Sequence, residues 1–127
     1  MLLPLISVII TTRNEEENLG FCLESIKKQT FPSSKVEVIV VDNNSTDKTK
    51  QIAKKYTPKI YNQGPERSAQ RNFGAQKARG KWLLFLDADT ILSSKAIKKG
   101  LKKGEKERLV GLYIAEIILG NSFWCQV

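Results

Sequence analysis

Apolar runs and amphipathic stretches alternate along most of this chain. The nearly continuous apolar runs at 5–10 and 82–86 predict strands that are covered on both faces, as in a parallel sheet flanked by helices. The run at 36–41 predicts a strand that begins half-buried and ends fully apolar, and a short strand is expected at 59–61.

Between these strands the apolar positions return with the helical period. The first helix is predicted over 15–29, behind an acidic first turn, with its apolar positions at Leu19, Cys22, Leu23 and Ile26. Further helices are expected from about 47 to 56, over 69–79 with Gly80 as C-cap, and over about 94–103. The alternation predicts an α/β fold with a mostly parallel sheet flanked by helices, in a single domain over 1–127. The segment 109–119 is apolar enough for a strand or a buried helix.

Two acids, Asp87 and Asp89, follow the apolar run 82–86 directly. Ligands of open α/β sheets bind at the carboxyl ends of strands, and neighbouring carboxylates repel each other unless a cation lies beside them. Mg²⁺ or Mn²⁺ suits such a pair. A turn with a helix cap at Ser93 or Ser94 is the competing explanation. An aspartyl phosphatase motif does not fit, because Ile91 stands where its Thr is needed.

Polar side chains also follow the other predicted strands. These candidates are Thr11, Arg13 and Glu15 after the first strand, Asp42 and Asn43 after the second, and Arg67 and Arg71 in the loop and helix that precede the run at 82–86. Carboxylates can bind a base and a ribose, arginines can bind phosphates, and a metal can bridge a diphosphate. The combination therefore predicts a nucleotide site.

Composition narrows the chemistry that the chain can use. Histidine is absent, which excludes Ser-His-Asp triads, Cys-His pairs and His-based zinc sites within the chain. The net charge of +8 comes largely from seven basic residues between 95 and 108. A solvated helix face explains them more simply than a membrane-surface or nucleic-acid patch. No aromatic residues are interleaved to stack bases, so nucleic acid is not an expected partner, and peripheral membrane contact stays open.

The start of the chain has no basic segment typical of a secretory signal, and no stretch reaches the ~20 apolar residues of a membrane span. Cys22 is expected to be a buried free thiol, far in sequence from Cys125. We therefore expect a cytoplasmic protein, or one at the cytoplasmic face of a membrane.

Three segments resemble the family 2 nucleotide-sugar glycosyltransferases with the A-type (GT-A) fold. They are SVIITTRNE at 7–15, VVDNNSTDKT at 40–49, and RNFGA at 71–75 through FLDAD at 85–89, in the order that the family has them. The resemblance implies an inverting transfer of a sugar, of the hexosyltransferase type, from a nucleoside diphosphate donor. It implies metal ligation by Asp89, with Asp87 near the ribose and the metal. It also implies that Thr11, Glu15 and Asp42 surround the nucleoside and that Arg71 lies near the phosphates.

The sequence departs from the family at two positions and in length. Arg13 replaces an aromatic residue that often stacks on the base, and Asn43 replaces an acid, so the base is left open. Only 38 residues (127 minus 89) follow Asp89, whereas the family places its acceptor-binding half and general base further downstream. Glu105, Glu107 and Glu116 are the acids in that stretch. The chain is therefore expected to lack the acceptor half, and the alternative is a module that binds nucleotide-sugar without transferring it. The acceptor, whether saccharide, lipid-linked carrier or protein, stays open.

Overall fold

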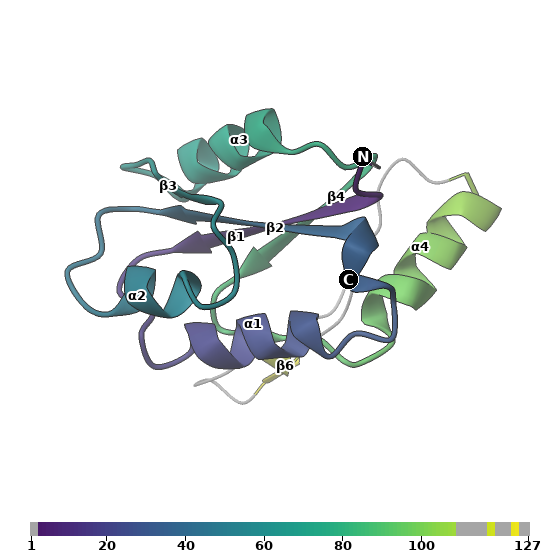
Figure 1. Cartoon of the computed structure of the whole chain (residues 1–127), viewed down its shortest axis with the longest axis horizontal. Helices are drawn as coiled ribbons and strands as arrows, with labels where there is room; N and C mark the ends of the chain where they lie inside the picture. The colour runs from purple at the N-terminus through teal and green to yellow at the C-terminus, as the bar shows by residue number, and fades with distance from the viewer. Residues whose placement is uncertain (1–2, 109–116, 119–122, 125–127) are drawn as a thin grey trace.

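The computed structural model describes residues 3–108, 117–118 and 123–124. Its centre is a four-stranded sheet in the order β3-β2-β1-β4, with every neighbouring pair parallel (Figure 1). The strands are β1 (Ile6–Thr12), β2 (Val36–Asp42), β3 (Ile60–Asn62) and β4 (Trp82–Asp87). The predicted α/β architecture with a mostly parallel sheet is confirmed.

Helices cover both faces of this sheet. On one face lie α1 (Leu19–Lys27) and α2 (Thr49–Ala53), and on the other lies α3 (Arg67–Lys77) (Figure 1). A 3-10 turn, η1 (Ser33–Lys35), precedes β2, and α4 (Ala96–Lys106) follows the sheet. A small antiparallel sheet joins β5 (Thr90–Ile91), β6 (Ile117–Ile118) and β7 (Phe123–Trp124).

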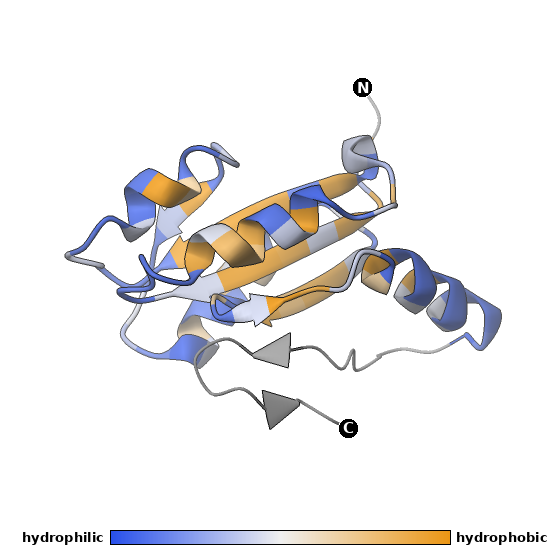
Figure 2. Ribbon diagram, turned by 90° about the horizontal axis from the view of Figure 1, so that it is seen from below, coloured by the Kyte–Doolittle hydropathy of each residue, from blue (hydrophilic) through white to orange (hydrophobic). Residues whose placement is uncertain are grey.

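The core consists of two apolar layers, one on each face of the sheet. The strands between these layers are largely hydrophobic (Figure 2). The larger layer joins the strands to α1, α2 and α4, and the smaller layer joins Ile9, Ile39 and Val41 to α3. Gly74 allows α3 to approach closely, because a Cβ at this position would lie 2.5 Å from Ile9 Cγ2.

The prediction that β4 is covered on both faces is wrong. The strand lies at the edge of the sheet among the described residues, and its side chains alternate between half-buried or buried and exposed. Leu83 is 41% exposed and Phe85 is 43% exposed. An unbroken apolar run therefore marks this strand without implying two covered faces.

The first helix begins at Leu19 rather than at Glu15, so the acidic residues precede it. The physical reason lies in the loop after β1. Asn14 has a positive φ of 50°, and the next two backbone N–H groups are already bound by side chains from the loop after β2 and from the first residue of α2. Glu15 N donates to Thr49 Oγ1 at 2.8 Å, and Glu16 N donates to Asp47 Oδ2 at 3.2 Å.

Other boundaries shift by a few residues. The third helix runs from Arg67 to Lys77, so that Ala78 is its C-cap, and α2 ends at Ala53. Gly80 serves a close approach instead of a cap, because a Cβ there would lie 2.7 Å from Ser7 N. The fourth helix has Lys95 rather than a serine at its N-cap.

Two other expectations can be compared with the structure only where they concern described residues. Cys22 is buried and free, as predicted. The segment 109–119 lies outside the described residues except for β6. Within the described ranges, no helix combines the length and apolar character needed to cross a membrane.

Candidate functional site

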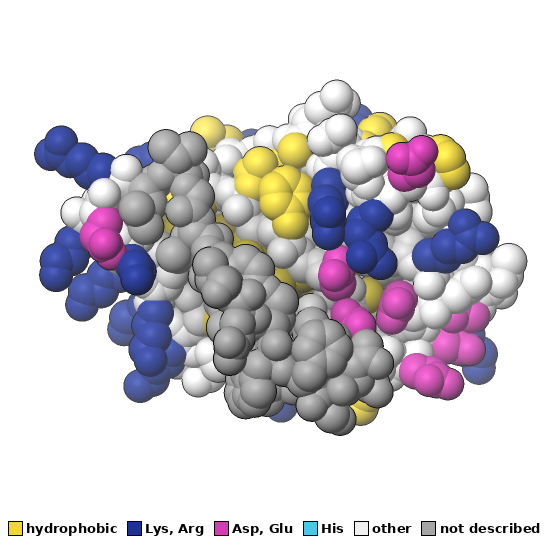
Figure 3. All heavy atoms as spheres, turned by 180° about the vertical axis from the view of Figure 1, so that it is seen from behind, with side chains coloured by type: hydrophobic (Ala, Val, Ile, Leu, Met, Phe, Trp, Pro, Cys, Tyr) yellow, Lys and Arg dark blue, Asp and Glu magenta, His cyan; other side chains and the backbone are white. Residues whose placement is uncertain are grey.

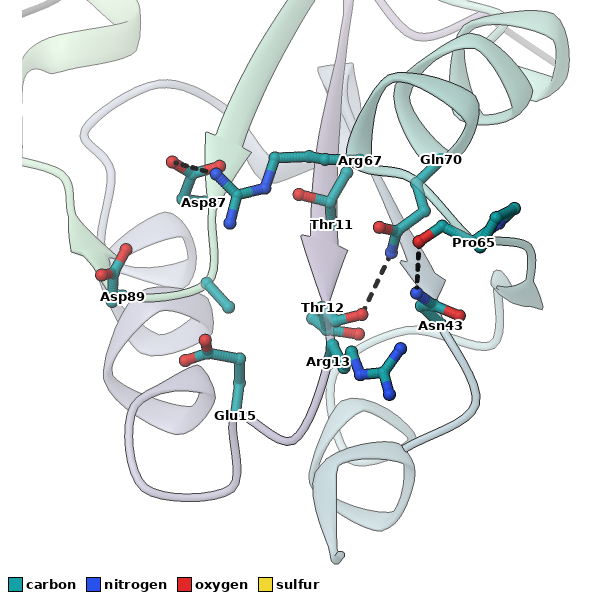
Figure 4. A pocket seen from close by; sticks show the side chains of 11 residues that line it. Thr11, Thr12, Arg13, Glu15, Asn43, Pro65, Arg67, Gln70, Asp87 and Asp89 are labelled. Atoms are coloured by element: carbon teal, nitrogen blue, oxygen red, sulfur yellow. Dashed lines mark hydrogen bonds and ion pairs between the residues drawn. The ribbon is translucent and has the colours of Figure 1, made fainter. Parts of the chain in front are cut away.

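A cavity of about 320 Å³ opens at the carboxyl ends of β1, β2 and β4 (Figure 4). It is lined by Thr11, Thr12, Arg13, Glu15, Asn43, Pro65, Arg67, Gln70, Asp87, Ala88 and Asp89. Seven of the nine residues singled out in the sequence belong to this lining. The other two, Asp42 and Arg71, lie next to it.

One wall of the cavity is acidic. Glu15, Asp87 and Asp89 come from the loop after β1 and from the end of β4, and they lie on one side of the cavity (Figure 4). Burial raises the pKa of Glu15, and the negative charges of Asp89 and Asp87 raise it further against the opposing effects of Asn18 and Arg67. Burial is the largest cause of this rise in pKa, and the two aspartates place negative charge beside Glu15 on the same wall.

Two arginines of α3 face this wall. Arg67 Nη1 lies 3.7 Å from Asp87 Oδ2, and Arg71 Nη2 lies 3.5 Å from Asp87 Oδ1. All three side chains are more than 40% exposed, so these ion pairs are open to solvent and weak. The guanidinium groups can therefore turn toward an anionic ligand without breaking a buried contact.

The acidic wall suits a hard cation that also binds phosphate. No group of three His, Cys, Asp or Glu side chains among the described residues could hold a metal ion. Mg²⁺ needs less than that, because it is usually bound by one or two carboxylates together with water and substrate phosphates. The donor set of Asp87 and Asp89 fits such an ion when a diphosphate completes its shell.

Asp42 lies beneath the loop after β2 and is fully buried. Its carboxylate accepts hydrogen bonds from Thr12 Oγ1 at 2.5 Å and from Ser45 N and Oγ at 2.8 and 2.6 Å. Lys50 Nζ lies 3.9 Å from it. In this structure Asp42 organises the ends of β1 and β2, whereas the next residue, Asn43, lines the cavity.

The wall opposite the acids is uncharged except for Arg13 at its border (Figure 4). Asn43 Nδ2 donates to Pro65 O at 2.9 Å, which connects the loop after β2 to the loop before α3. Gly64 permits this contact, because a Cβ there would lie 2.3 Å from Asn43 Oδ1.

Sequence reasoning missed Thr12, Pro65, Gln70 and Ala88 as lining residues. Gln70 is the most informative of them, since it is only 4% exposed on an otherwise polar helix. Its spacing of four from Gly74 was the available signal, because both residues face the sheet.

The loops after β1 and β2 are held together by hydrogen bonds. Asn14 N donates to Ser45 Oγ at 2.8 Å, and Thr46 N donates to Asn14 Oδ1 at 2.9 Å. Partial burial would raise the pKa of Asp47, but donors from Thr49 and Glu16 outweigh it and hold that pKa below its ordinary value. This interlock fixes the backbone that carries Arg13 and Glu15.

Cys22 lies under the acidic wall, with Sγ 3.9 Å from the Asp87 carbonyl oxygen. Burial raises the pKa of its thiol to about 12, and the charges of Asp89, Asp87 and Glu15 act in the same direction. Because the thiolate is the reactive form, this cysteine is a packing residue rather than a nucleophile.

Comparisons with known proteins agree with this geometry. The family model described as glycosyl transferase family 2 matches residues 7–124. The glycosyltransferase AglE of Haloferax volcanii is 39% identical over 106 residues, which cover 78% of this chain and 35% of AglE. This chain therefore spans about a third of the length of that relative.

Two solved structures share the fold. The crystal structure of Staphylococcus aureus TarS 1-349 in complex with UDP-GlcNAc has a TM-score of 0.74 and 33% identity, over 82% of this chain and 32% of that one. The mannosyltransferase PcManGT of Pyrobaculum calidifontis, in complex with GDP-Man and Mn²⁺, has a TM-score of 0.69 and 26% identity, over 80% of this chain and 32% of that one.

Proposed function

Because this chain belongs to glycosyl transferase family 2, we propose that its cavity binds a nucleoside diphosphate sugar whose sugar is transferred with inversion to an acceptor. The observation that carries this proposal is the division of the cavity. One wall gathers Glu15, Asp87 and Asp89 beside two arginines, and the opposite wall is uncharged except for Arg13 at its border. A nucleotide-sugar has the same division between a charged diphosphate and a neutral base.

In this proposal Asp87 and Asp89 hold Mg²⁺ or Mn²⁺. Such an ion would offset the charge that develops on the departing diphosphate. The donor set supports this role, as does the Mn²⁺ in the similar mannosyltransferase structure. Arg67 and Arg71 turn from Asp87 to phosphate oxygens, Thr11 and Glu15 contact the nucleotide, and the planar guanidinium of Arg13 lies against the base.

The proposed reaction is a displacement at the anomeric carbon. The bond from this carbon to the diphosphate oxygen breaks, and its electron pair leaves with the nucleoside diphosphate. An acceptor hydroxyl oxygen forms the new bond on the opposite face and gives its proton to a base. Positioning of the donor by the two cavity walls is the part of this reaction that the described residues can supply.

A binding module without transfer activity is the second candidate. Glu105 and Glu107 belong to the end of α4, where a Cβ on Gly104 would lie 2.9 Å from Trp82 at the amino end of β4. Both acids are therefore at the opposite end of the sheet from the cavity (Figure 1). Glu116 lies outside the described residues. Measuring sugar transfer and donor hydrolysis beside donor binding separates the two candidates.

The basic helix α4 could also hold the protein at a membrane surface. Its lysines at 98, 99, 102, 103 and 106 are exposed, while Ile97 and Leu101 are buried in the core. Basic side chains project from one end of the molecule (Figure 3). This separation leaves only charge for contact with lipid, so any binding would be sensitive to salt. Sedimentation with anionic vesicles at low and high salt tests it, and a solvated surface predicts no binding at either.

The decisive experiment for the site is a calorimetric titration with UDP and GDP in the presence and absence of Mn²⁺. We expect Mn²⁺ to strengthen binding, and Asp89→Ala to remove that gain, because the metal links the acidic wall to the diphosphate. The matched control is Glu17→Ala, which removes an exposed acid outside the cavity lining. If Asp89→Ala keeps the full response to Mn²⁺, the metal assignment is wrong.

A further inference from the structure

The side-chain amide of Gln70 has a fixed orientation. Its Nε2 donates to Thr12 O at 3.0 Å and to Val41 O at 2.8 Å, at the ends of β1 and β2. Backbone carbonyl oxygens can only accept hydrogen bonds, so the NH₂ group must face the strands. The carbonyl oxygen, Oε1, therefore faces the other way, into the cavity (Figure 4).

This oxygen is free to accept a hydrogen bond from whatever fills the cavity. Gln70 is 4% exposed, and both of its hydrogen bonds within the described part of the chain use Nε2, so Oε1 is the atom that stays open to the cavity. An acceptor that a bound ligand shields from water without bringing a donor costs free energy. Water can meet the need in the free protein, and a ligand that replaces the water must bring its own donor.

The position of Gln70 indicates which part of a nucleotide-sugar it would meet. The acids and arginines lie across the cavity, where the diphosphate and metal are expected, and Gln70 belongs to the neutral wall with Asn43 and Pro65. Asn43 Nδ2 is already bonded to Pro65 O. The Asn43 oxygen packs against Gly64, so the amide group that the neutral wall offers to the base is the Gln70 oxygen.

We propose, on the basis of the nucleotide-sugar site argued above, that Gln70 determines nucleobase specificity by accepting a hydrogen bond from a ring N–H. Uracil, thymine and guanine carry such an N–H beside a carbonyl group. Cytosine and adenine carry an unprotonated ring nitrogen at the corresponding edge, which would face Oε1 acceptor to acceptor. A site built to bond an N–H rejects a ligand that lacks it, because the bound ligand shields the acceptor from water and leaves it unpaired.

The test first compares nucleotides on the unmodified protein and then compares two protein variants. In calorimetry with Mn²⁺, the full chain should bind UDP or GDP more tightly than CDP and ADP. Methylation of the ring nitrogen of the preferred base, at N3 of uracil or N1 of guanine, should weaken binding by about threefold to tenfold or more. Gln70→Met keeps the length of the side chain without the amide, and it should bind the parent and methylated nucleotides equally. Gln76→Met changes an exposed glutamine of the same helix and should keep the wild-type preference.

The outcomes separate this inference from the function on which it rests. If no nucleoside diphosphate binds, the proposed function fails and Gln70 has no base to select. If nucleotides bind but the unmodified protein accepts the methylated base, CDP or ADP as well as its preferred ligand, the inference fails and the site stands. If Gln70→Met weakens the binding of the parent and methylated nucleotides by the same factor, Gln70 serves only to connect β1 and β2 through its hydrogen bonds. Should that variant not fold, the methylated nucleotide on the unmodified protein decides alone.

Discussion

The two ends of the central sheet both carry carboxylates, but their surroundings are opposite. At the amino end Glu37, whose side chain is 2% exposed, accepts hydrogen bonds from Ser7 Oγ at 2.6 Å and from Arg79 N at 2.9 Å, and it also pairs with Lys59. At the carboxyl end Glu15, Asp87 and Asp89 face one cavity, and the Asp87 side chain is 42% exposed.

The pKa directions express the same difference. Burial would raise the pKa of Glu37, but donors from Lys59, Ser7 and Arg79 outweigh it and lower that pKa. The pKa of Glu15 is raised chiefly by burial, and the negative charges of Asp89 and Asp87 add to the rise. A carboxylate that is bonded within the protein stabilises the fold, whereas carboxylates that face each other favour a cation from outside.

The largest effect that separates the two ends should be on stability. Glu37→Ala leaves the Arg79 amide and the Lys59 ammonium without their buried partner, and it should lower the free energy of unfolding by about 3 kcal/mol. Asp89→Ala is the counterpart at the other end and should change it by less than about 0.5 kcal/mol. Urea denaturation measures both. Equal losses in the two variants would contradict the distinction.

The next effect should appear in binding and not in stability. Arg71→Ala should weaken the binding of UDP by about tenfold or more and leave the binding of uridine unchanged. The reason is that a guanidinium contributes roughly 1.5 to 3 kcal/mol to a phosphate contact. Its pairing with Asp87 is solvent-exposed, so the free energy of unfolding should hardly change. Arg79→Ala, an exposed arginine at the amino end, is the matched control. An equal loss for uridine and UDP would show that Arg71 does not act through phosphate.

The carboxyl end was the more predictable part from sequence, for a physical reason. Parallel strands end at one edge, so polar residues directly after apolar runs must meet there, as Thr11, Asn43 and Asp87 do. The position of a strand within the sheet does not follow from its local sequence, because it depends on pairing between distant segments. The apolar run of β4 could not reveal that Leu83 and Phe85 stay exposed.

Side-chain contacts between loops explain the other failures. The start of α1 depends on Thr49 and Asp47, which lie about 30 residues away and bind the amides of Glu15 and Glu16. The burial of Gln70 depends on the carbonyl groups at the ends of two different strands. Local periodicity records neither contact, because each one exists only after the sheet has formed.

The smallest effect that distinguishes the two ends should be a dependence on pH. The folded-state pKa of Glu37 lies below its ordinary value of 4.5, so in acid the unfolded chain binds the proton first. The stabilisation from the ionised carboxylate is therefore complete above about pH 5 and is lost as the pH falls through 4.5 toward the folded pKa. Glu37→Gln keeps the side-chain shape and should be less stable than the wild type by about 1 to 2 kcal/mol at pH 7. This difference in the free energy of unfolding should narrow steadily between pH 5 and pH 3, as measured by urea denaturation at each pH. The acids common to both proteins, including Asp47, contribute equally to the two stabilities and do not affect the difference. A difference that stays constant over this range would mean that Glu37 is not held ionised by Ser7, Lys59 and Arg79.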